Sequence, residues 1–189
     1  MIKYAVTTAP TVEPISLADA KAHLRTITGD TSEDSAIITP LIQAAREYCE
    51  NITGRALAAQ TVKAYPDYWG LWRLPRPPLI SVTSIKYYDE DNTEYTLAAV
   101  DYQVDAVDGQ IHILTEPDVT LRDLNPIVVE YTCGYTTGNA LPAAVRQAML
   151  LLIGHWYMNR ETVVAGATTS VEIDLTTRAL LRQYKAWWF

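Results

Sequence analysis

The chain has 189 residues, 49% of them apolar and 20% charged, which is ordinary for a globular protein with a core of its own. Fifteen lysines and arginines against 22 aspartates and glutamates give a net charge of −7, which argues against a protein that grips nucleic acid or anionic lipid through a basic surface. Two cysteines are too few for a disulfide framework. The first residues lack the hydrophobic run of a signal peptide, and no apolar run approaches the ~18 residues of a membrane span. We therefore expect a soluble protein, made in the cytoplasm, with reduced thiols.

Two helices are predicted near the N-terminus. Ser16 followed three residues later by Asp19 forms an aspartate version of the capping box, and the apolar spacing behind it predicts a helix over residues 17–27. A broad apolar stripe predicts a second helix over residues 34–52. Because a proline inside a helix costs about 3 kcal/mol, this second helix either starts close to Pro40 or is kinked there.

The middle of the chain carries strand patterns. Alternating, β-branched or aromatic runs, separated by turn residues, predict strands at 60–65, 82–88, 95–97, 102–107, 110–114 and 127–132. The dipeptide Asp108-Gly109 between two such runs indicates a tight hairpin. Residues 75–78, Pro-Arg-Pro-Pro, indicate a stiff extended connector.

Helical patterns return towards the C-terminus. Pro142 suits a first helical turn, and the residues behind it predict a largely apolar helix that ends near residue 161. Residues 162–174 are small and mostly uncharged, which indicates a flexible loop. A last helix is expected from about residue 175.

These elements predict an α+β fold that is mainly a helical bundle, with an inserted antiparallel β unit and a C-terminal helical docking tail. The expected boundaries are 1–161 for a single domain (helical core 14–56 and 141–161, β insertion 57–133), 162–174 for the loop and 175–189 for the docking helix.

The sequence nominates no catalytic, metal or cofactor residue. It contains no phosphate-binding glycine loop, dinucleotide fingerprint, zinc-protease helix or serine-nucleophile elbow, and its three histidines show no i, i+4 pairing. The acidic run 89–92 lacks the glycine and the glutamate of a calcium loop, so we interpret it as a charged hairpin tip. Cys49 and Cys133 are expected to be buried packing residues rather than nucleophiles.

The end of the chain is rich in aromatic residues, which are typical anchors of protein interfaces. We expect the tail to dock on a partner; the alternative is that these residues fold back into the protein's own core. The candidate docking residues are Leu180, Leu181, Tyr184, Trp187, Trp188 and Phe189.

In this order, the segments resemble the head–tail connector (adaptor) proteins of long-tailed bacteriophages and related gene-transfer particles, over nearly the whole chain. The residues that carry the resemblance are EPISLADAK (13–21) with Leu24 behind it, LIQAAREYCE (41–50), TGRAL (53–57), LPRPPLISV (74–82), IKYYD (85–89), YTCGY (131–135) and the helix over 142–161, which ends in HWYMNRE.

The resemblance implies a structural virion protein rather than an enzyme, located in the neck between capsid and tail and made in the cytoplasm of a bacterial host. Such adaptors assemble as a ring, usually of twelve copies, beneath the portal vertex. The candidate docking residues would then bind the portal protein, and the opposite end would receive a stopper, head-completion or tail protein. DNA would pass through the ring without specific binding, and no cofactor is implied. A net charge of −7 per copy favours an acidic or neutral channel lining.

Two other classes of function stay open. A soluble protein-binding module would share the aromatic tail but would not form rings. A small carboxylate-dependent hydrolase would need a cleft that holds titrating groups with shifted pKa values.

Overall fold

The chain folds into two units of different secondary structure. The computed structural model describes residues 2–24, 32–136, 141–159 and 170–186. Residues up to 11 together with 58–135 form the β unit, and residues 12–57 together with the described chain from residue 136 form the helical unit. The β unit thus includes the first residues of the chain as well as its middle.

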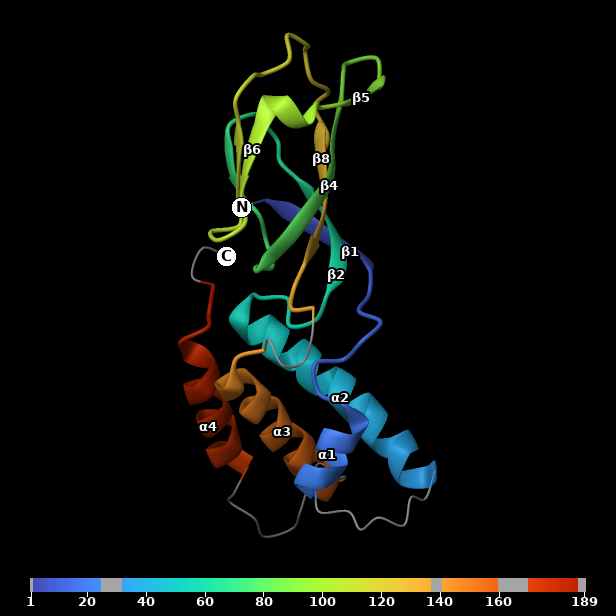
Figure 1. Ribbon diagram of the computed structural model, residues 1–189, viewed down its shortest axis with the longest axis vertical. Helices are drawn as coiled ribbons and strands as arrows, with labels where there is room; N and C mark the ends of the chain where they lie inside the picture. Colours follow the sequence, from blue (N-terminus) through green and yellow to red (C-terminus); the bar gives the residue numbers. More distant parts are fainter. Residues whose placement is uncertain (1, 25–31, 137–140, 160–169, 187–189) are drawn as a thin grey trace. The chain divides into compact units, whose positions relative to one another are not determined.

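Four helices make up the described part of the helical unit (Figure 1). They are α1 (Leu17–Leu24), α2 (Ser32–Thr53), α3 (Ala143–Met158) and α4 (Ser170–Arg182). α2 and α3 each contact the other three helices, so they form the centre of this unit. The ring of Tyr48 on α2 meets that of Trp156 on α3 edge to face, with centroids 6.1 Å apart. The buried apolar side chains include Ile15, Ala20, Ile38, Ile42, Ala45, Cys49, Val145, Ala148, Met149, Leu152, Ile153 and Leu181.

The predicted capping box at the start of α1 is confirmed. The Asp19 backbone N–H donates to Ser16 Oγ over 3.0 Å, and the Ser16 hydroxyl donates to Asp19 Oδ2 over 2.7 Å. The hydroxyl of Ser16 and the guanidinium of Arg146 on α3, 3.0 Å away, lower the pKa of the Asp19 carboxyl. The box therefore both starts α1 and links it to α3.

α2 runs through Pro40 without interruption, so the predicted later start near this proline is wrong. Beside the proline, the Thr39 hydroxyl donates to the carbonyl of Ser35 one turn earlier in the helix. The helix begins two residues before the predicted position 34 and ends one residue after 52.

A buried ion network joins α2 to the chain on either side of it. Arg46 Nε donates to Glu13 Oε2 over 2.9 Å, and Arg46 Nη1 donates to Glu50 Oε2 over 3.2 Å. The other oxygen of Glu50 accepts the backbone N–H of Leu57 over 2.9 Å. Because a buried charge is tolerated only when it is paired and hydrogen-bonded, this network fixes the positions of Glu13 and Leu57 relative to α2.

Eight strands form two sheets in the described part of the β unit (Figure 1). They are β1 (Lys3–Thr8), β2 (Gln60–Tyr65), β3 (Leu71–Arg73), β4 (Leu79–Tyr88), β5 (Glu94–Thr96), β6 (Tyr102–Asp105), β7 (Gln110–Ile113) and β8 (Ile127–Cys133). The five-stranded sheet has the order β1-β2-β8-β4-β5, and the three-stranded sheet has the order β3-β7-β6. All pairings are antiparallel.

β8 is central to the five-stranded sheet. It pairs with β2 on one side and β4 on the other, and its residues alternate between buried and half-buried from Ile127 to Cys133. The hydroxyl of Tyr131 donates to the carbonyl of Pro75 over 2.7 Å, which ties the proline-rich connector to the core, and burial raises the pKa of that hydroxyl. The core of the β unit therefore lies on one face of this sheet.

The predicted hairpin at Asp108-Gly109 is confirmed as the turn between β6 and β7. Gly109 has a φ of 65°, a left-handed conformation that glycine adopts without steric cost. Asp105 Oδ1 accepts the N–H groups of Val107 and Asp108 over 2.9 and 3.1 Å.

The α+β class is confirmed, but a mainly helical bundle is not, because strands are about as common as helices in the described chain. Two strands lie outside every predicted one, namely β1 and β3. α4 begins at Ser170, so residues 170–174, which we assigned to the loop, are helical, and the helix ends at Arg182. The rest of that predicted loop, residues 162–169, lies outside the described residues.

Replacing Glu50 by alanine should destabilise the helical unit by about 3 kcal/mol, because it removes one carboxylate from a buried arginine and the acceptor of the Leu57 N–H. Glu47→Ala is the matched control. Glu47 also approaches Arg46, at 3.7 Å, but its side chain is 67% exposed against 4% for Glu50, so the control should cost under about 0.5 kcal/mol. Urea unfolding followed by circular dichroism gives both values, and equal losses would contradict the role assigned to the network.

Replacing Gly134 by alanine should destabilise the β unit by clearly more than replacing Gly109. Both have positive φ, which costs an alanine about 1 kcal/mol. A Cβ on Gly134 would also lie 2.1 Å from the backbone oxygen of Ala58, whereas a Cβ on Gly109 meets no atom within 4 Å. Thermal unfolding of the two variants checks this, and similar melting temperatures would show that the backbone at Ala58 can move away cheaply.

Candidate docking surfaces

The C-terminal docking residues expected from the sequence do not share one environment. Leu181 on α4 is 0% exposed and belongs to the core of the helical unit, where α4 packs on α3 and α2. Leu180 and Tyr184 are half-buried. Trp187, Trp188 and Phe189 lie outside the described residues. Leu181 therefore attaches the tail to its own protein and does not present a surface to a partner.

The chain beyond α4 is attached to the C-terminal end of α2. The N–H of Ala186 donates to the carbonyl of Thr53 over 2.7 Å, and Ala186 is buried. Arg55 Nε donates to the carbonyl of Tyr184. These contacts use backbone atoms of the tail, so no sequence pattern could have revealed them. The burial of Leu181 together with Thr177, one turn earlier on α4, is a pattern that a helical reading could have found.

The opposite side of α4 is exposed. Leu175 is 62% exposed, and the exposed residues around it on the helix include Arg178, Ala179 and Arg182. An exposed leucine beside two arginines is a surface that a partner protein can cover. This surface was not selected from the sequence.

The two cysteines are buried, as the sequence predicts for packing residues. Burial raises the pKa of the Cys49 thiol to about 12, which keeps it protonated at neutral pH. Within the described ranges, no three His, Cys, Asp or Glu side chains gather where they could hold a metal ion. His155 Nδ1 lies 3.1 Å from the Asn159 amide at the end of α3, a local contact of the helix terminus.

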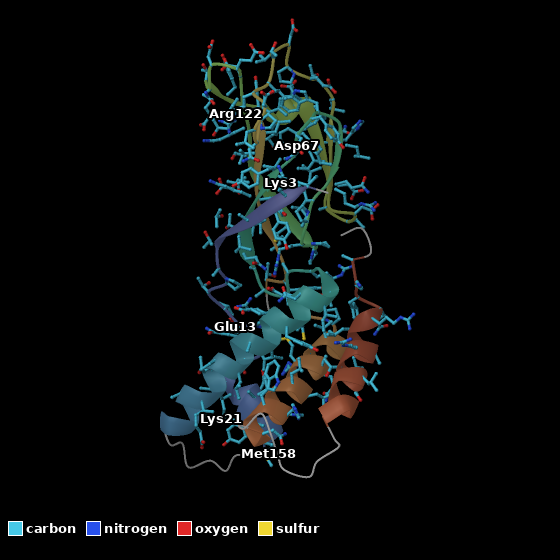
Figure 2. The ribbon with its side chains drawn as sticks, turned by 180° about the vertical axis from the view of Figure 1, so that it is seen from behind. Lys3, Glu13, Lys21, Asp67, Arg122 and Met158 are labelled. Atoms are coloured by element: carbon cyan, nitrogen blue, oxygen red, sulfur yellow. The ribbon has the colours of Figure 1, made fainter. Side chains whose placement is uncertain are left out.

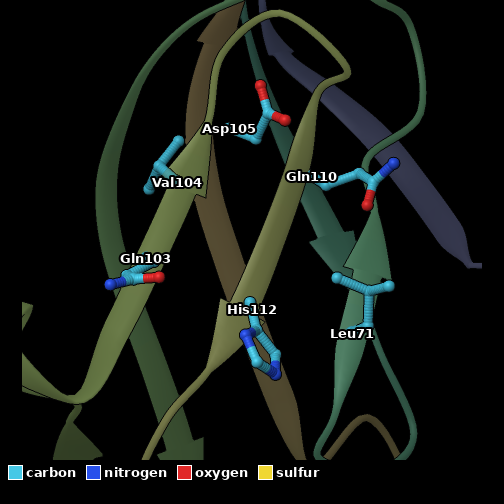
Figure 3. Close-up of a pocket in the computed structure, with 6 residues that line it drawn as sticks. All are labelled: Leu71, Gln103, Val104, Asp105, Gln110 and His112. Carbon is cyan, nitrogen blue, oxygen red and sulfur yellow. The ribbon is translucent and has the colours of Figure 1, made fainter.

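A shallow hollow of about 320 Å³ lies on the three-stranded sheet (Figure 3). Gln103, Val104 and Asp105 line it from β6, Gln110 and His112 from β7, and Leu71 from β3. One imidazole and one carboxylate are the titratable groups among these residues, and the Asp105 carboxylate already accepts two N–H groups of the β6–β7 turn. The described residues that line the hollow include no nucleophilic side chain next to a general base, which is the pair that hydrolysis by covalent catalysis requires.

The negative charge of the protein is concentrated in one segment of the β unit. Residues 89–125 contain ten acidic residues and one basic residue, Arg122, which gives −9, while the other residues contain 12 acidic and 14 basic residues, which gives +2. The guanidinium of Arg122 (labelled in Figure 2) lies 3.9 Å from the ring centre of Tyr88 and donates to the carbonyl of Asn125. Arg122 Nη1 also donates to Asn92 Oδ1 over 3.2 Å, so one arginine links the acidic loops 89–94 and 116–125.

The rest of the acidic hairpin is organised by hydrogen bonds. The Lys86 ammonium and the Tyr88 hydroxyl each donate to Glu94 over 2.6 Å. The hydrogen bond from Lys86 is the largest cause that lowers the pKa of Glu94, while the bond to Glu94 raises the pKa of the Tyr88 hydroxyl. The carboxylate of Asp89 accepts the Thr93 N–H, and no glycine or glutamate completes a calcium loop there.

None of the helices in the described chain has both the length and the apolar character needed to cross a bilayer.

Comparison with protein families matches residues 14–186 to the family model described as "Head completion protein". The match includes the strands β2–β8 as well as all four helices. A search of curated proteins finds no sequence that matches.

Several solved structures share this fold. A chain of the "Neck of empty GTA particle computed with C6 symmetry" matches with a TM-score of 0.76 and 23% identity, over 97% of this chain and 95% of that chain. A chain of the "Virion of native gene transfer agent (GTA) particle" matches with a TM-score of 0.74 and 21% identity, over 96% of this chain and 94% of that chain. A chain of the "Neck of native GTA particle computed with C12 symmetry" matches with a TM-score of 0.71 and 21% identity, over 98% of this chain and 94% of that chain.

Replacing Leu181 by alanine should destabilise the helical unit by about 2–5 kcal/mol, because it leaves a cavity beneath α4. Leu175→Ala removes the same atoms from an exposed position of the same helix and should change stability by under about 0.5 kcal/mol. Chemical denaturation compares the two variants. A small effect at Leu181 would mean that α4 is not part of the folded core.

Proposed function

This chain belongs to the head completion protein family, and on that premise we propose that it is a structural connector in the neck of a tailed particle. In this role it joins the DNA-filled capsid to the tail, and it acts by binding other proteins rather than by catalysis. The observation that carries the proposal is the family match over residues 14–186, which leaves out only short segments at the two ends of the chain.

The connector assembles as a closed ring of copies beneath the portal protein. Chains of similar fold occur in necks computed with sixfold and twelvefold symmetry, and their likeness extends over 94% or more of each chain, which supports this step. Head-to-tail contacts that close on themselves generate such rings, and each copy then uses two different surfaces. We propose twelve copies, with the stopper, another head-completion protein or a tail protein bound on the side away from the portal.

DNA passes through the ring without specific binding. The charge distribution supports this step, because a channel must not hold DNA through many phosphate contacts. The net charge of the residues outside 89–125 is only +2, and the segment 89–125 is strongly acidic, so the chain has no large positive net charge with which to bind phosphate groups. An acidic or neutral lining lets the duplex slide.

The tail docks on the portal protein through the residues beyond the attachment at Ala186. Trp187, Trp188 and Phe189 supply the aromatic anchors, and the half-buried Leu180 and Tyr184, earlier in the chain, also contact the portal protein. Leu181 serves a different purpose: by packing in the helical unit it holds the start of the tail in place. The attachment of Ala186 to Thr53 limits the chain entropy that docking has to overcome.

Removing residues 187–189 should leave a folded protein that no longer co-sediments with rings of the portal protein from the same particle. The truncation spares Leu181 and Ala186, both buried, so stability should change little. We expect binding to fall by at least tenfold, because the three aromatic anchors are lost.

Two control variants sharpen this measurement. Replacing all three residues by alanine keeps the chain length and should lose binding as fully as the truncation, whereas Val107→Ala on the exposed β6–β7 turn should bind normally. Full binding by the truncated protein would contradict docking through this tail, and failure of the unmodified protein to bind portal rings would contradict the connector function itself.

A further inference from the structure

The five-stranded sheet ends in two strands that, within the described chain, have a neighbour on one side only. β1 pairs with β2 and β5 pairs with β4, and the described residues place no further strand beyond either. The free side of an edge strand presents N–H and C=O groups that can hydrogen-bond to another extended chain. The sheet therefore offers two places at which a strand can be added.

These two edge strands run in the same direction. The direction alternates across β1-β2-β8-β4-β5 because every pairing is antiparallel, and the number of strands is odd. A second copy set beside the first by a small rotation would bring its β1 next to β5 of the first copy, with the two strands parallel. The necks that contain chains of similar fold were computed with sixfold and twelvefold symmetry, in which neighbouring copies are related by rotation about one axis and meet head to tail.

The core face of β1 is incompletely covered. Tyr4 lies opposite Ala64 of β2 and Val6 lies opposite Val62, so both point to the same side as these two fully buried residues. Tyr4 is nevertheless 44% exposed and Val6 43% exposed. The Arg76 guanidinium, 5.9 Å from the ring centre of Tyr4, contacts one side of this aromatic group. The apolar face of the sheet thus continues to its edge without being closed there.

The core face of β5 shows the same feature. Tyr95 lies opposite Tyr87 of β4, and the two rings stack with centroids 5.2 Å apart and planes 18° apart. Tyr87 is buried, whereas Tyr95 is 38% exposed. Both ends of the sheet therefore carry a partly exposed aromatic residue on the face that is buried in the middle.

The other face of the two edge strands carries opposite charges. Lys3 (labelled in Figure 2) begins β1 and is exposed, on the side of the sheet away from Tyr4. Glu94 begins β5 and stays 45% exposed beside Lys86. Because successive side chains of a strand alternate between faces, Lys3 and Glu94 lie on the same face when Tyr4 and Tyr95 share the opposite one.

We propose that the β1 strand of one copy adds in parallel to the β5 strand of the next copy, so that the sheet continues from copy to copy around the ring. In this register Tyr4 lies beside Tyr95, Lys3 beside Glu94 and Ala5 beside Thr96. The inference rests on the proposed function, since it assigns the two surfaces through which the connector ring closes. Pairing β1 with β1 would instead be isologous and would end at a dimer.

A double-cysteine variant, Ala5→Cys with Thr96→Cys, tests the register directly. Both positions are exposed, and the native Cys49 and Cys133 are buried, so only the introduced thiols should react. Assembled on portal rings and mildly oxidised, the variant should give a ladder of covalent multimers on a non-reducing gel. Each single variant should give no multimer beyond a dimer.

The control is a double variant with the same number of thiols, Val107→Cys with Thr96→Cys, in which one thiol sits on the β6–β7 turn at a residue that is 95% exposed. Equal multimer yields from the two double variants, on particles that image as rings, would overturn the β1–β5 pairing and leave the connector function standing. Absence of rings from the unmodified protein on portal would overturn both.

A charge placed on the free edge supplies a second test that needs no cross-link. Val6→Lys puts an ammonium on the apolar face of β1, and we expect ring assembly on portal to fall at least tenfold, because natural edge strands use lysine to prevent such pairing. Val107→Lys makes the same change on the turn and should assemble normally. Normal assembly of a folded Val6→Lys protein would count against the proposal.

Discussion

The helical unit depends on one buried arginine. Arg46, near the middle of α2, holds Glu13 before α1 and Glu50 one turn further along its own helix. Glu50 in turn accepts the N–H of Leu57, the last residue before the chain enters the β unit. Burying any one of these charges without its partners would be costly, so the ion pairs among the three side chains depend on one another. The network thus sets where the chain enters the helical unit and where it leaves it.

The elements with a local cause were predictable from the sequence. Ser16 and Asp19 form the capping box that their spacing predicts, and Asp108-Gly109 makes the turn that this dipeptide favours. The strand patterns between residues 60 and 133 correspond to six of the eight strands described. In each case the residues that determine the structure lie within a few positions of one another.

The elements with a distant cause were missed. β1 is exposed along its whole length and pairs with β2 more than fifty residues later, so its own sequence lacks a buried face that would reveal it. α4 starts earlier than expected because composition alone does not separate a weakly apolar helix from a loop. The attachment of Ala186 was missed because a hydrogen bond to the backbone of α2 leaves no trace in the sequence, whereas the burial of Leu181 follows the helical spacing with Thr177 and was overlooked. The family resemblance therefore identified the function before the residues that perform it.

The two units of the connector contribute differently to its function. The helical unit holds the start of the tail, and the β unit carries the acidic loops and both free edges of the large sheet. A closed ring on the portal is the arrangement on which this role depends, and native mass spectrometry of the complex with portal rings measures it. We expect the mass of a single species with twelve copies of the 21.1 kDa chain per portal ring. One or two copies per portal ring, with no larger species at saturation, would contradict it.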